Sequence, residues 1–100
     1  MAEVTGFCAP GFEGVHEAFA ANFAERGDVG GAVAVYLDGE PVVDLQGGVT
    51  EPGGSEPYGP HHLQLVYSST KGATAICAHM LAERGLLDLD APVATYWPEF

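Results

Sequence analysis

One short stretch of this sequence places a hydroxyl nucleophile close to an amine. Lys71 is the only lysine in the chain, and Ser68 and Ser69 are two of its three serines. The stretch stands where a long apolar helix is predicted to begin. Residues three apart on a helix are neighbours. We therefore expect Ser68 Oγ and Lys71 Nζ to meet.

Such a pair suits nucleophilic catalysis. A serine hydroxyl is a weak nucleophile until a base removes its proton. A lysine amine serves as that base when burial and nearby positive charge, including a helix dipole, lower its pKa below about 10.4. Backbone N–H groups at a helix N-terminus can also stabilise an oxyanion. The alternative is that Ser68 caps the helix and Lys71 is solvated, and the spacing alone does not decide between the two.

The helix that would carry this pair is predicted over residues 70–84. Its apolar residues recur at helical spacing: Ala73, Ile76, Cys77, Met80 and Leu81. Its other faces hold mostly glycine and alanine, and Gly85 ends it. A helix that is apolar on nearly all sides is typical of the centre of a large protein. We therefore expect residues 1–100 to be the N-terminal portion of a single larger domain.

Two elements are predicted before this helix. Residues 11–26 are expected to form an amphipathic helix with an apolar stripe at Phe12, Val15, Phe19 and Phe23. Residues 31–46 are expected to form a β-hairpin, because Asp38-Gly39 suits a two-residue type I′ turn. The hairpin strands are Ala32–Leu37 and Val42–Leu45. Together these elements indicate an α+β fold.

The remaining segments are predicted to be loops and a short helix. Residues 47–62 form a long loop, in which Tyr58 could line a substrate pocket or simply pack, and the same alternative holds for Tyr67. His61 and His62 lack a third ligand, so a metal site is not expected. Asp90 is expected to cap a short helix that runs to Tyr96.

Composition excludes several classes of function. The net charge is −11, which opposes nucleic-acid binding and attachment to anionic membranes. The acidic N-terminus lacks the basic start and apolar run of a secretory signal, which favours a cytoplasmic location. Cys8 and Cys77 stand far apart and are expected to be reduced thiols. No cofactor motif is present, so none is expected.

The segment Val66–Gly72 resembles the Ser-x-Thr-Lys motif of the serine β-lactamase and penicillin-binding-protein-like hydrolases. The likeness is greatest to the class C-like branch with its esterases. The two predicted strands look like the first two strands of that family. Leu81–Val93 is similar to the segment that follows the nucleophile helix in that family, and Trp97–Phe100 resembles the family's closing Leu/Trp-Pro-Glu-Phe motif.

This resemblance implies an antiparallel sheet flanked by helices, the β-lactamase/transpeptidase-like fold. The chain would supply its N-terminal helix, first two strands and nucleophile helix. Ser68 would be the acyl-enzyme nucleophile and give a backbone oxyanion donor, and Lys71 would be the general base. The family adds a Tyr-x-Asn-type motif and a Lys-x-Gly or His-x-Gly motif, neither of which occurs in residues 1–100.

Three functions therefore remain open. The first is a serine hydrolase, preferably a carboxylesterase, with a small-molecule ester or amide substrate. The second is a β-lactamase or D,D-peptidase. The third is a noncatalytic fragment or scaffold, if the chain ends at Phe100. Residues 1–100 alone are expected to be inactive, because two of the implied motifs are missing.

Overall fold

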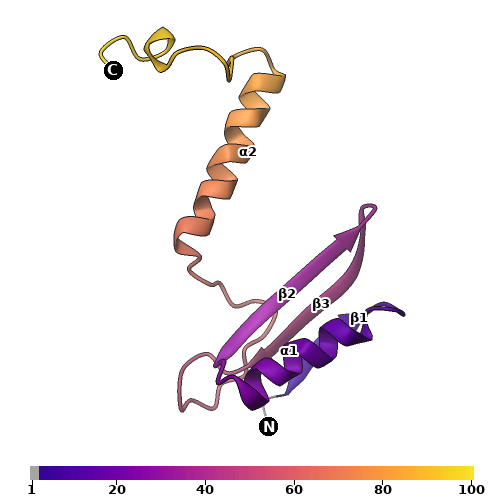
Figure 1. Cartoon of the computed structure of the whole chain (residues 1–100). Helices are drawn as coiled ribbons and strands as arrows, with labels where there is room; N and C mark the ends of the chain where they lie inside the picture. The colour runs from indigo at the N-terminus through magenta and orange to yellow at the C-terminus, as the bar shows by residue number, and fades with distance from the viewer. Residues whose placement is uncertain (1–2) are drawn as a thin grey trace. The chain divides into compact units, whose positions relative to one another are not determined.

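A computed structural model describes residues 3–100, which divide into a unit that ends at Leu63 and a second unit, Gln64–Phe100 (Figure 1). The first unit contains strand β1 (Val4–Cys8), helix α1 (Glu13–Glu25) and strands β2 (Gly30–Leu37) and β3 (Glu40–Gly48). The second contains the 3₁₀ turn η1 (Tyr67–Ser69), helix α2 (Thr70–Glu83) and the 3₁₀ turn η2 (Val93–Thr95).

The three strands form an antiparallel sheet in the order β1-β3-β2, with α1 packed on one face (Figure 1). The β2–β3 hairpin confirms the predicted one. Its turn residues Asp38 and Gly39 have φ values of 51° and 84°, as a type I′ turn requires. The predicted helix over residues 11–26 is confirmed as α1. Strand β2 begins at Gly30, two residues before its predicted start. Strand β3 runs from Glu40 to Gly48, well beyond the predicted Val42–Leu45, so residues 47 and 48 belong to this strand and not to the predicted loop.

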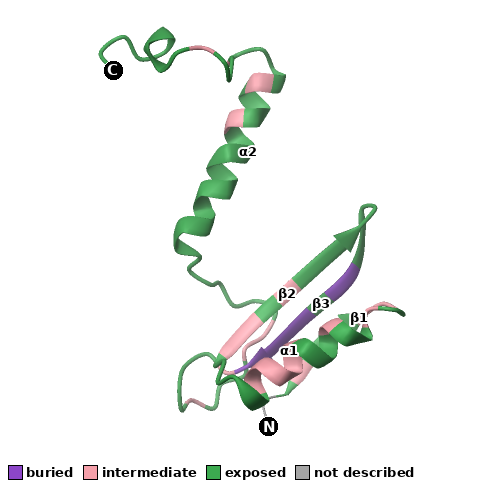
Figure 2. Cartoon of the chain, viewed as in Figure 1, coloured by how far each residue is buried: buried purple, intermediate pink, exposed green. Residues whose placement is uncertain are grey.

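The core of the first unit lies between β3 and α1. Val43 and Leu45 are two residues apart on β3, so they share one face of the sheet, and they are 0% and 1% exposed. The predicted stripe on α1 packs against them through Phe12, Val15 and Phe19. Figure 2 shows that burial is concentrated along β3. The apolar stripe predicted on this helix therefore covers the buried face of the sheet.

Strand β1 was not predicted. Its five residues lack a period-two pattern, because Gly6 interrupts them with a φ of 112°. A side chain at Gly6 would collide with the Asp44 carbonyl, so the close approach of β1 to β3 requires glycine there. The strand forms through pairing with β3, some forty residues later in the chain, which no local pattern reveals.

Helix α2 confirms the predicted main helix and its stop. Gly85 has a φ of 71°, and its N–H donates to the Ala82 carbonyl at 2.9 Å. The Leu86 N–H donates to the Leu81 carbonyl at 2.9 Å, which completes a Schellman motif. No residue of α2 is buried within the described chain (Figure 2). The apolar surface of α2 is therefore uncovered by residues 3–100.

The predicted cap at Asp90 is wrong. Turn η2 begins after Pro92, which stands at the N-cap position and provides no side-chain cap. Asp90 lies two residues too early to reach those N–H groups, and its own N–H donates to Asp88 Oδ1 at 3.0 Å. The Asp88 N–H in turn donates to the Tyr96 hydroxyl at 2.7 Å. The segment is therefore held by a turn at Asp88 and by Tyr96.

Among residues 3–100, no helix combines the length and the apolar character needed to cross a membrane.

Candidate active site

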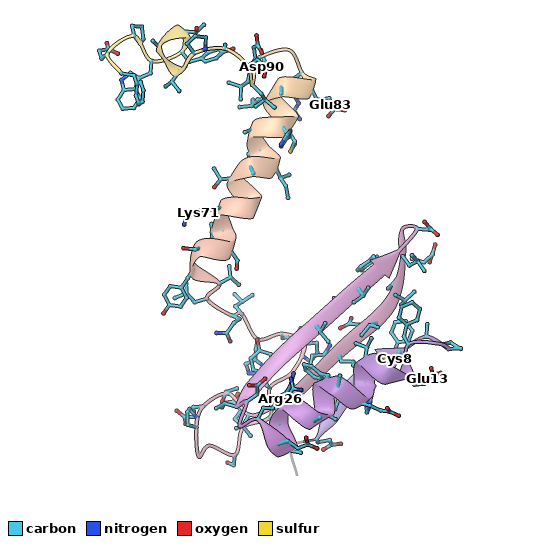
Figure 3. All side chains as sticks on the ribbon, in the orientation of Figure 1. Cys8, Glu13, Arg26, Lys71, Glu83 and Asp90 are labelled. Carbon is cyan, nitrogen blue, oxygen red and sulfur yellow. The ribbon has the colours of Figure 1, made fainter. Side chains whose placement is uncertain are left out.

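Ser68 and Lys71 meet, as their spacing predicts. Lys71 Nζ donates a hydrogen bond to Ser68 Oγ at 2.9 Å. Ser68 belongs to turn η1, and Lys71 lies in the first turn of α2, where Figure 3 labels it. This distance falls in the range over which a base can take a proton from a nucleophile. The contact is therefore suitable for proton transfer, and both side chains are exposed in the described chain.

The capping alternative for Ser68 does not hold. The N-cap of α2 is Ser69, and its side chain makes no capping hydrogen bond. Ser68 lies one position earlier, within the turn that leads into the helix. Its Oγ is thereby left to face Lys71 rather than the backbone of α2.

The turn before the helix sets this arrangement. The Ser69 N–H donates to the Val66 carbonyl at 3.1 Å and closes a turn around Tyr67 and Ser68. Tyr67 has a φ of 47°, in the left-handed region. The sequence analysis missed this feature, because a tyrosine gives no signal for such a conformation. Only the positions of Ser68 and Lys71 could be inferred from spacing.

The two tyrosines proposed for substrate binding lie in different units. Tyr67 directly precedes Ser68 and is 79% exposed. Tyr58 belongs to the loop after β3, where its N–H donates to the Gly48 carbonyl at 3.0 Å. Its ring lies 5.2 Å from the ring of His62. Loop packing accounts for the position of Tyr58, and a role for either tyrosine in binding substrate stays a prediction.

His62, the second of the paired histidines, is held by loop contacts. The His62 Nδ1 accepts a hydrogen bond from the Gly59 N–H at 2.9 Å, and its Nε2 lies 3.5 Å from Glu56 Oε1. Within residues 3–100, no three side chains of His, Cys, Asp or Glu gather as metal ligands would. His62 thus serves to order the loop that carries Tyr58.

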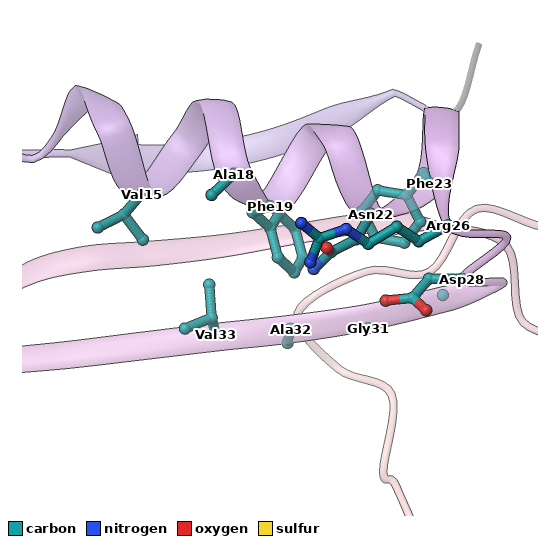
Figure 4. A pocket seen from close by; sticks show the side chains of 11 residues that line it. Val15, Ala18, Phe19, Asn22, Phe23, Arg26, Asp28, Gly31, Ala32 and Val33 are labelled. Carbon is teal, nitrogen blue, oxygen red and sulfur yellow. The ribbon is translucent and has the colours of Figure 1, made fainter.

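A hollow of about 480 Å³ lies in the first unit, between α1 and the start of β2 (Figure 4). Its lining is mostly apolar, with Arg26 and Asp28 among the polar residues. It contains no serine, cysteine or histidine. The hollow therefore offers a packing surface, and the nucleophile and base lie elsewhere.

An antiparallel sheet covered by a helix, and a serine and lysine paired at the start of a second helix, are features of the serine β-lactamase-like hydrolases. The Beta-lactamase family model matches residues 18–100, and the chain belongs to this family. The resemblance seen in the sequence is thereby confirmed.

Individual relatives agree with this assignment. The chain is 50% identical over 97 residues to Esterase/beta-lactamase LipL of Mycobacterium tuberculosis (strain ATCC 25618 / H37Rv), a match that covers 97% of this chain and 23% of LipL. The crystal structure of a family VIII carboxylesterase matches with a TM-score of 0.91 and 46% identity, over 97% of this chain and 26% of that one. The chain therefore spans about a quarter of the length of these relatives.

Proposed function

We propose that the protein containing this chain is a serine hydrolase that forms an acyl-enzyme at Ser68, and that its substrates are small carboxylic esters. The observation that carries this proposal is the hydrogen bond of 2.9 Å between Lys71 Nζ and Ser68 Oγ. The names of the two relatives, an esterase/beta-lactamase and a carboxylesterase, support the ester substrate class.

In the proposed reaction, the Ser68 hydroxyl gives its proton to an unprotonated Lys71 amine while Oγ attacks the ester carbonyl carbon. The Ser68 backbone N–H would be one donor to the resulting oxyanion. Collapse of this intermediate breaks the bond to the alkoxide, which leaves as the alcohol with the proton held by Lys71. Water then attacks the acyl-serine, releases the carboxylic acid and restores the Ser68 hydroxyl.

We further propose that residues 1–100 form the N-terminal portion of a larger hydrolase domain. Helix α2 has no buried residue in the described chain, and its exposed Ile76, Met80 and Leu81 are side chains that a core ordinarily contains. The partial coverage of both relatives supports the same proposal. The rest of the domain would enclose the nucleophile and supply further catalytic groups.

The direct test is intact-mass spectrometry of the native protein after labelling with a fluorophosphonate. We expect one adduct in the wild type and none in Ser68→Ala. Ser69→Ala is the matched control, because it removes the neighbouring hydroxyl, which makes no capping bond. Labelling of Ser68→Ala, or loss of labelling only in Ser69→Ala, would contradict the proposal.

The second candidate is a β-lactamase or D,D-peptidase, favoured by the family name and by the second half of the LipL name. Turnover of p-nitrophenyl butyrate against nitrocefin separates the two candidates. Ester turnover that is lost in Ser68→Ala supports the esterase. Nitrocefin turnover without ester turnover would favour the second candidate.

A further inference from the structure

Tyr67 has a backbone conformation that its side chain does not favour. Its φ is 47°, and only one other non-glycine residue in the described chain, Asp38, has a positive φ. Asp38 occupies a type I′ turn, where aspartate is well tolerated. A bulky tyrosine has no short polar group to compensate the clash of its Cβ with the backbone. The conformation of Tyr67 therefore needs a cause in its surroundings.

The turn around Tyr67 explains what this conformation achieves. Tyr67 is the first central residue of the turn that the bond from the Ser69 N–H to the Val66 carbonyl closes. A positive φ at that position ordinarily selects glycine. Two residues later the backbone is already helical, with φ of −61° and ψ of −20° at Ser69. The change from left-handed to right-handed backbone thus falls across Ser68.

The side chain of Tyr67 offers no competing explanation within residues 3–100. It is 79% exposed. Its hydroxyl makes no hydrogen bond, and its ring pairs with no aromatic ring, among the described residues. Strained backbone of this kind is often found where a functional group must be held in one orientation.

We propose that Tyr67 is a positioning residue, whose left-handed backbone directs Ser68 Oγ toward Lys71 Nζ. The inference rests on the proposed function, since it concerns the same nucleophile. It assigns the orientation of Ser68 to backbone conformation at residue 67, and not to contacts of the tyrosine ring. The acylation rates of variants at position 67 should then rank in the order in which the new residues tolerate a positive φ.

The test is a series in the native protein: Tyr67→Phe, Tyr67→Gly, Tyr67→Ala and Tyr67→Val. The readout is the rate constant for acylation, measured from the p-nitrophenol burst, together with kcat and KM, at a temperature where circular dichroism shows each variant folded. We expect Tyr67→Phe to keep the wild-type acylation rate constant within a few-fold. Tyr67→Gly should do so at saturating substrate, because loss of the ring from the predicted substrate pocket would raise KM and leave that rate constant unchanged. Tyr67→Ala should be slower than Tyr67→Gly. Tyr67→Val should be slowest, by about tenfold or more, because a β-branched residue tolerates a positive φ least.

Two controls sharpen the result. Asp38→Gly relieves the same backbone strain in the β2–β3 turn, and it should leave the acylation rate unchanged. The comparison of Tyr67→Gly with Tyr67→Ala does not depend on whether Tyr67→Val folds. Equal acylation by Tyr67→Gly and Tyr67→Ala would overturn the proposal. An equal loss of acylation rate in Tyr67→Gly and Tyr67→Ala, with Tyr67→Phe still active, would assign the effect to the aromatic ring and would also overturn the proposal. If the wild type itself forms no adduct at Ser68, the proposed function fails, which is a distinct outcome.

Discussion

Lys71 Nζ lies 2.9 Å from Ser68 Oγ, across the junction between turn η1 and helix α2. This relationship predicts that the amine, and not merely a positive charge, is needed for acylation. Lys71→Met should lower the acylation rate by about 10²–10⁴-fold, the usual effect of losing a general base. Lys71→Arg should be similarly impaired, because a guanidinium stays protonated and cannot accept the proton. Burst kinetics with p-nitrophenyl butyrate measure both effects.

Circular dichroism of both variants provides the control, since an exposed lysine should be dispensable for folding. If Lys71→Arg kept the wild-type acylation rate, Lys71 would act through its charge alone. That result would contradict the proton transfer proposed for the pair.

The second prediction concerns the core beneath α1. Leu45 is 1% exposed and packs with Val43 under the aromatic side chains of α1. Leu45→Ala should lower the free energy of unfolding by about 2–5 kcal/mol, because it leaves a cavity. Leu45→Met is the matched control and should cost less than about 1.5 kcal/mol, since it conserves volume. Denaturant unfolding measures both values, and equal costs would show that Leu45 lies outside the core.

The third prediction concerns Gly47, which continues the face of β3 that carries Val43 and Leu45. A Cβ at Gly47 would lie 2.9 Å from Phe23 Cε2 and 3.1 Å from Val4 Cγ2. Gly47→Ala should therefore destabilise the protein by about 1–3 kcal/mol through overpacking. Gly31→Ala on β2 is the control, because its Cβ would meet nothing within 4 Å. Phe23→Leu combined with Gly47→Ala should recover part of the loss, as thermal unfolding would show.

The sequence allowed much of the local structure to be predicted. Apolar spacing defined α1 and α2, and Asp38-Gly39 defined the hairpin turn, because each depends on residues close together in the chain. The positions of Ser68 and Lys71 followed from the same helical spacing. The family and the fold of the chain followed from its motifs, and the family match and the structural match confirmed both.

Features set by distant strand pairing, by side-chain hydrogen bonds within a turn or by an unusual backbone conformation could not be predicted. Strand β1 depends on pairing with β3, and its Gly6 hides the alternation that would indicate a strand. The cap expected at Asp90 failed because the Tyr96 hydroxyl and Asp88 hold that segment in a turn of their own. The left-handed conformation of Tyr67 contradicts its residue type, and such local conflicts are expected mainly at functional or strained sites.

The fourth prediction concerns the start of α1 and its dependence on pH. The Glu13 carboxylate accepts hydrogen bonds from the Gly11 N–H at 2.9 and 3.1 Å. Hydrogen bonds from the backbone of Glu13 and of Gly11 hold the pKa of this carboxyl below its ordinary value of 4.5. The folded state thus favours the charged form. Its stabilising effect is complete above the ordinary pKa and disappears as the pH falls through the lowered pKa.

Glu13→Gln should therefore cause a small drop in Tm near neutral pH and none once the pH lies below the lowered pKa. The effect is small because the carboxylate is exposed and screened by solvent. Glu17→Gln on the same helix is the matched control, since Glu17 makes no side-chain hydrogen bond in the described part of the chain, and its difference in Tm should not change with pH in this way. A Tm difference for Glu13→Gln that persisted in acid would show that the hydrogen bonds to Gly11 do not depend on the charge, and would contradict this account of how α1 begins.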